Sequence, residues 1–189
     1  LDPQGDIGVR SLWPGGNVFR FFWENRSSAL QRVDTASVRR TRQLPPNLDY
    51  RQNGFGLDAN WARLDYRFNP RRGWAVQAKT SAGFHQVRRN NQIESISSSD
   101  FNYSNLYDTL TTRNTRFRGE FRGEYYIPIF RRAALKAALR GGGILSRRPV
   151  SQNEQYRLGG GNTARLIGLR GFDEESLFAT RFAIATFEA

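Results

Sequence analysis

Apolar and polar residues alternate with a period of two along much of this chain. The clearest segment runs from Asn114 to Ile129, where Phe, Gly, Tyr and Ile alternate with charged residues. Because successive side chains of a strand point to opposite faces, this pattern predicts a strand with one apolar and one charged face. The same pattern predicts strands at 19–24, 61–68, 74–84, 133–145 and 178–189.

The two predicted strands at 114–129 and 133–145 define what each face carries. Residues on the charged face are Arg116, Arg118, Glu120, Arg122, Glu124, Lys136 and Arg140. Residues on the apolar face include Phe117, Phe121, Tyr125, Leu135 and Leu139. We expect the first set to face a wet interior and the second set to face lipid.

Connections between the predicted strands are of two kinds. The short ones contain Pro or Gly, as hairpin turns require, and lie at 13–16, 69–73 and 128–132. The long ones are polar and lie at roughly 31–53, 88–112 and 147–176. Since short and long connections alternate, the topology is predicted to be antiparallel and up-and-down, with all long loops at one end.

Strand length then distinguishes between kinds of antiparallel sheet. The predicted strands are longer than the ~5–6 residues usual in soluble sheets, and about 9–11 tilted residues suffice to cross a bilayer. Together these features are typical of an all-β transmembrane β-barrel, of which about seven strands are present. We therefore expect residues 1–189 to be part of one barrel domain, with further strands outside it. A soluble barrel or sandwich with one buried face stays open as an alternative.

Composition narrows the function classes. The chain has 29 Lys and Arg against 17 Asp and Glu, a net charge of +12, and 13% aromatic residues. Basic residues mixed with aromatic ones also suit single-stranded nucleic acid, which keeps a soluble nucleic-acid-binding protein as a weaker alternative. The absence of Cys excludes disulfides, thiolate metal sites and Cys nucleophiles within the chain.

No motif indicates catalysis or a cofactor. The glycine-rich stretch at 159–168 lacks the lysine of a phosphate-binding loop. Glu120 and Glu124 would lie roughly 13 Å apart on a strand, too far for the carboxylate pair of a glycosidase. His85 is the only histidine, which excludes a histidine-rich metal site, and we expect it to lie in water at a strand end. We expect no enzyme, no metal and no cofactor.

One segment carries a family resemblance. Three glycines, Gly159, Gly160 and Gly161, precede the motif Leu169, Arg170, Gly171 and Phe172, and a strand follows. This arrangement resembles the long extracellular loop of outer-membrane assembly factors of the BamA and TamA type, the bacterial surface antigen family. The turns at 69–73 and near 128 also resemble that family, so the likeness spans roughly residues 54–189. The extra residues between the glycines and the motif depart from the family pattern.

The resemblance implies a bacterial outer-membrane protein that folds or translocates other outer-membrane or secreted proteins. It implies that the loop returns into the barrel, where Arg170 meets an acidic residue, for which Glu188 is the candidate here. Expected partners are outer-membrane lipid, client proteins and accessory lipoproteins, with no nucleic acid. Periplasmic domains would precede the barrel. A two-partner-secretion type transporter shares the loop motif and remains the alternative function.

Overall fold

The computed structural model describes residues 4–96, 101–108, 110, 113–130, 133–160, 167–169 and 171–189. Its strands are β1 (Gln4–Trp13), β2 (Asn17–Ser28), β3 (Tyr50–Leu64), β4 (Gly73–Val87), β5 (Asn114–Phe130), β6 (Ala133–Ser146), β7 (Tyr156–Leu158), β8 (Leu177–Ala179) and β9 (Arg181–Glu188). Two short α-helices, α1 (Thr35–Thr41) and α2 (Asn91–Glu94), lie in the connections, together with 3₁₀ turns at Pro14–Gly16, Tyr103–Tyr107 and Gln152–Glu154.

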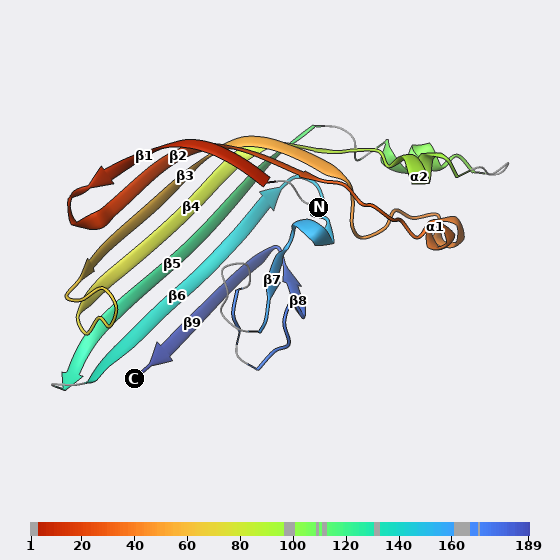
Figure 1. The fold of residues 1–189 in the computed structure, drawn as a ribbon. Coiled ribbons are helices and arrows are strands. Elements are labelled where there is room, and N and C mark those ends of the chain that lie inside the picture. The colour runs from red at the N-terminus through yellow and green to blue at the C-terminus, as the bar shows by residue number, and fades with distance from the viewer. Residues whose placement is uncertain are drawn as a thin grey trace.

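Seven of the strands form one curved antiparallel sheet (Figure 1). The strand order is β1-β2-β3-β4-β5-β6-β9, so each strand pairs with its neighbours in the chain except where β7 and β8 intervene. This confirms the predicted antiparallel up-and-down arrangement. The sheet is open, with β1 and β9 at its edges, so the described strands do not close into a barrel.

Short and long connections lie at opposite ends of the sheet, as the alternation predicted. The 3₁₀ turn at 14–16 and the turn at 65–72 lie at one end, and the helices α1 and α2 project from the other (Figure 1). Two predicted boundaries were wrong. The third strand begins at Tyr50 and ends at Leu64, so Tyr66 and Phe68 belong to the turn. The fifth strand continues to Phe130 through a register irregularity after Pro128, so residues 128–130 of the expected turn at 128–132 belong to the strand, and 131–132 lie outside the described residues.

The pairing register places most of the large apolar side chains of the strands on one surface of the sheet. Cross-strand partners share a face, and partners such as Val9 and Phe21, Ala82 and Phe117, and Gly123 and Leu139 define the apolar face. Exposed large side chains on this apolar face are Ile7, Val9, Phe19, Phe21, Trp23, Phe55, Leu57, Trp61, Trp74, Phe84, Phe117, Phe121, Tyr125, Ile127, Leu139, Leu145 and Phe187. The opposite surface, the charged face, carries most of the charged side chains of the strands.

The connections that contain α1 and α2 build a small core of their own beyond the sheet. Val38 of α1, Ile93 of α2 and Tyr107 are each at most 2% exposed and pack together. Asp34 and Asn90 cap the two helices by accepting hydrogen bonds from backbone N–H groups. No helix in the described part of the chain is long and apolar enough to cross a membrane.

Candidate functional site

On the charged face, ion pairs connect side chains of the same strand and of neighbouring strands. On β5, Arg122 lies 2.8 Å from Glu124, and Arg118 lies 3.7 Å from Glu120. Lys136 of β6 bridges Glu124 at 3.6 Å and Glu188 at 3.3 Å. The carboxylates of Glu120, Glu124 and Glu188 thus lie beside cations of the same face.

A segment between β6 and β9 folds back onto this face (Figure 1). We refer to residues 147–180, as far as they are described, as the folded-back loop. Tyr156 lies at its centre, with its hydroxyl donating to the carbonyl of Gly119 at 3.1 Å. The Tyr156 ring packs edge-on against Phe182 at 4.9 Å and lies under the guanidinium of Arg118 at 4.5 Å. With Ile144 and Leu158 it forms a small apolar core on an otherwise polar surface.

Glu154 is the main electrostatic anchor of the folded-back loop. Its side chain is 4% exposed and pairs with Arg116 of β5. His85 of β4 places Nε2 2.7 Å from the same carboxylate oxygen, close enough for a charge interaction although not aligned for a straight hydrogen bond. Burial alone would raise the pKa of Glu154, but His85 and Arg116 more than offset it and the pKa lies below its usual range.

The expectation that His85 lies in water is therefore wrong. Its side chain is 4% exposed, stacks on Tyr50 with ring centroids 5.3 Å apart, and faces the loop carboxylate. The alternation along β4 places residue 85 on the charged face together with Lys79 and Ser81. The alternation that places residue 85 on the charged face was visible in the sequence. The loop that covers this position could not be predicted from local pattern.

Polar contacts also attach the folded-back loop to the neighbouring connection between β2 and β3. Asn153 donates to the backbone carbonyl of Leu48 at 3.1 Å, and the amide of Gln152 donates to the carbonyl of Pro46 at 3.0 Å. Residues 152–154 are thus held on one side by the charged face and on another side by residues 46–48. None of these contacts was anticipated from the sequence.

Gly159 and Gly160 lie at the far end of the folded-back loop, near Leu169 and Phe172 of the motif. Gly159 and Gly160 both have positive φ angles, of 120° and 71°, and Gly160 pairs with Leu169. The amide of Gly160 donates to the carbonyl of Phe172, which is half exposed. The loop therefore closes on itself, bringing Gly160 against Leu169 and Phe172 of the motif.

Arg170 and Gly161 lie outside the described residues, so the pairing of Arg170 with Glu188 stays a prediction. Their neighbours are described. Gly168 and Leu169 line a cavity of about 570 Å³ together with Lys136 and Glu188 of the charged face. The motif segment and the candidate acidic partner thus border the same space. Of the acidic residues after the motif, Glu175 pairs with Arg157 of the loop itself at 2.6 Å, with both side chains substantially exposed.

Gly159→Ala is expected to loosen the folded-back loop. A Cβ at this position would lie 2.1 Å from the carbonyl oxygen of Asp173, and the φ angle of 120° disfavours any L side chain. We expect faster proteolysis of the loop in the full-length protein and a local cost of about 1–3 kcal/mol. Gly171→Ala is the control, since its φ is also positive but a Cβ would meet nothing within 4 Å. Equal protease sensitivity of the two variants would contradict the steric explanation.

The contacts of Glu154, Tyr156 and Asn153 hold the folded-back loop in place. No cluster of three or more His, Cys, Asp or Glu suited to a metal ion occurs among the described residues. Comparison with family models, with curated proteins and with solved structures finds no match for this chain.

Proposed function

We propose that this chain forms part of the wall of an outer-membrane β-barrel that assembles or translocates other proteins. The observation that carries the proposal is the apolar face, which continues across all seven strands and remains exposed. Val9, Phe55 and Phe187 are 76%, 57% and 73% exposed on it. Soluble monomers rarely expose apolar patches larger than a few hundred Å².

The distribution of aromatic residues on the apolar face supports a bilayer as the surrounding medium. Trp61, Trp74 and Tyr125 lie toward the end with the short turns, and Phe84 and Phe117 lie toward the end with the long loops. On β4 the distance from Trp74 to Phe84 is roughly 33 Å at ~3.3 Å per residue. A tilt of about 40° reduces the span across the membrane to about 25 Å, the height of the apolar band of such barrels.

The charged face and the folded-back loop support the functional part of the proposal. In a barrel the charged face would line a wet interior, and the loop on it carries the segment that resembles the assembly factors. Strands outside residues 1–189 would close the sheet between β1 and β9. No enzymatic step is part of this function.

Fractionation and depletion test the proposal in the organism. The full-length protein should sediment with the outer membrane and require detergent for extraction. Its depletion should lower many outer-membrane proteins together if it is an assembly factor. Retention of one secreted protein, with the others unchanged, would instead favour the two-partner-secretion alternative.

Recovery in the soluble fraction without detergent would overturn the membrane part of the proposal. A soluble protein that bound oligonucleotides with a strong salt dependence would favour the nucleic-acid alternative. That alternative leaves the exposed apolar face unexplained, and for this reason we rank it below the membrane protein.

A further inference from the structure

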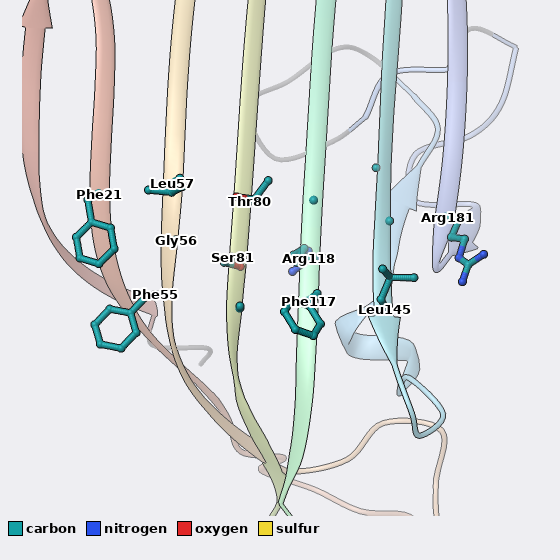
Figure 2. A pocket seen from close by; sticks show the side chains of 14 residues that line it. Phe21, Phe55, Gly56, Leu57, Thr80, Ser81, Phe117, Arg118, Leu145 and Arg181 are labelled. Atoms are coloured by element: carbon teal, nitrogen blue, oxygen red, sulfur yellow. The ribbon is translucent and has the colours of Figure 1, made fainter.

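A groove crosses the apolar face where small residues replace large ones (Figure 2). Its volume is about 680 Å³, and Thr80, Ala82, Gly119 and Gly143 lie along it. Phe21, Phe55 and Leu57 stand on one side, and Phe117 and Leu145 stand on the other, as Figure 2 shows. The sheet therefore has a shallow apolar channel in a surface otherwise covered by bulky side chains.

The groove continues into a second cavity of different chemistry. This cavity has a volume of about 1050 Å³ and shares Phe117, Leu145 and Arg181 with the groove. Its other charged lining residues are Arg113, Arg147 and Arg148, and among the residues that the structure describes no Asp or Glu lines either space. Arg181 lies on the apolar face itself, because it pairs in register with Gly143. We call these four residues the arginine pocket.

The arginine pocket lies at the end of the sheet that carries the long loops. Arg113 precedes β5, while Arg147 and Arg148 follow β6, so the pocket lies at one boundary of the apolar face. No carboxylate of the described chain forms an ion pair with Arg113, Arg147, Arg148 or Arg181. Four guanidinium groups without a paired anion thus border one end of an apolar channel.

We propose that the groove and the arginine pocket form a binding site for a phosphate-bearing membrane lipid. One acyl chain would lie in the groove, and the headgroup phosphate would accept hydrogen bonds from the arginine pocket. Guanidinium groups bind phosphate in bidentate geometry, and a groove lined by Gly, Ala and aromatic side chains fits an alkyl chain. This inference rests on the proposed function, since it places the apolar face in a bilayer with the pocket at the headgroup level of the leaflet on the loop side.

Charge complementarity favours this occupant over the others. A second copy of the chain would bring four more arginines to the same boundary, and like charges would repel. An uncharged lipid would fill the groove but leave the arginine pocket without an anion. A free phosphate would use the pocket but not the groove, so the combination of both spaces indicates an anionic amphiphile.

Native mass spectrometry of the full-length protein in non-ionic detergent tests the site. The probes are dioleoyl phosphatidic acid, dioleoylglycerol, which lacks the phosphate, and glycerol 3-phosphate, which lacks the acyl chains. We expect phosphatidic acid to bind at least about tenfold more tightly than either of the others. Replacing Arg147 and Arg148 together by Gln should weaken its binding by about tenfold or more.

A second variant tests the groove independently of charge. Gly119→Ile places a side chain in the channel, and a Cβ at Gly119 meets nothing within 4 Å, so the strand itself should tolerate it. It should weaken phosphatidic acid binding by a similar factor. Gly5→Ile is its control, because Gly5 also has an open Cβ position but lies on β1, away from the groove. Replacing Arg67 and Arg72 by Gln at the opposite end of the sheet is the control for charge.

Equal binding of phosphatidic acid and dioleoylglycerol would overturn the inference, as would unchanged binding in the arginine or Gly119 variants. Preference for glycerol 3-phosphate over the lipid would identify a free-phosphate site instead. The lipid-binding measurements can succeed or fail independently of the depletion experiment that tests the proposed function. A protein that shows the lipid selectivity but whose depletion leaves client proteins unchanged would keep the lipid site and lose the assembly role.

Discussion

Leu139→Arg is expected to prevent the full-length protein from reaching its folded, membrane-inserted form. Leu139 lies in the middle of β6 on the apolar face and is 50% exposed. An arginine that faces lipid near the middle of a bilayer costs about 2–4 kcal/mol in a barrel. A water-soluble sheet would tolerate the same change, because an exposed position offers an arginine free access to water.

The neighbouring substitution Arg140→Leu provides the matched control. Arg140 lies on the charged face, directly opposite Arg122 on β5. Removing one of two like charges that face each other relieves repulsion, so we expect little effect on assembly. Heat-modifiable migration of the outer-membrane protein in gel electrophoresis measures the folded fraction of both variants. Equal folded fractions for Leu139→Arg and Arg140→Leu would contradict the membrane orientation of the sheet.

The contrast between these neighbours illustrates what local pattern could predict. The pleat of a strand forces side chains to alternate, so strand identity and the two faces could be derived from the order of residues in 114–129 and 133–145. Strand ends were less certain, because Tyr66 and Phe68 continue the alternation into a turn where Asp65 accepts hydrogen bonds from the amides of Arg71 and Arg72.

Features that depend on distant contacts could not be derived in the same way. The helices α1 and α2 have 7 and 4 residues, too short to be stable alone, and they form because Val38 and Ile93 pack into a shared core. The groove on the apolar face requires the register of β3 to β6, which brings small residues of several strands side by side. Period-two patterns predict a face but not where neighbouring strands align.

The anchoring role of Glu154 also depends on distant contacts and could not be derived from the local sequence. It is a single acidic residue in a polar stretch, and nothing in the local sequence distinguishes it from Glu174 or Glu175. Its importance arises because β4 and β5 place His85 and Arg116 under the position where residue 154 comes to lie. The glycines of the loop could be recognised from sequence, whereas this ion pair could not.

Glu154→Gln is expected to release the folded-back loop from the charged face. The change removes the negative charge that compensates Arg116, whose side chain is 4% exposed. Breaking a buried ion pair by removing one partner costs about 3–5 kcal/mol, because the remaining charge stays buried without compensation. Hydrogen exchange of the backbone amides in 150–160 should therefore accelerate roughly a hundredfold or more in the full-length protein.

Acid should have the same effect as the substitution. Because the pKa of Glu154 is lowered in the folded protein, its contribution to stability is complete above the ordinary carboxyl value of 4.5 and disappears as the pH falls through the lowered value. The loop of the wild-type protein should thus exchange slowly at neutral pH and open as acid protonates Glu154, at a pH below 4.5. The variant His85→Gln tests whether the imidazole or the Glu154 carboxylate causes the opening in acid. The acid-dependent opening should persist in this variant, because Arg116 still pairs with Glu154.

Glu175→Gln is the matched control for the anchor. It breaks an ion pair of the same loop, with Arg157, but both side chains of that pair are more than 40% exposed. Exposed ion pairs contribute about 0–1 kcal/mol, so amide exchange in 150–160 should remain close to that of the wild type. If the Glu175 and Glu154 variants exchanged equally fast, burial of the Glu154 carboxylate could not be the reason that the loop stays on the charged face.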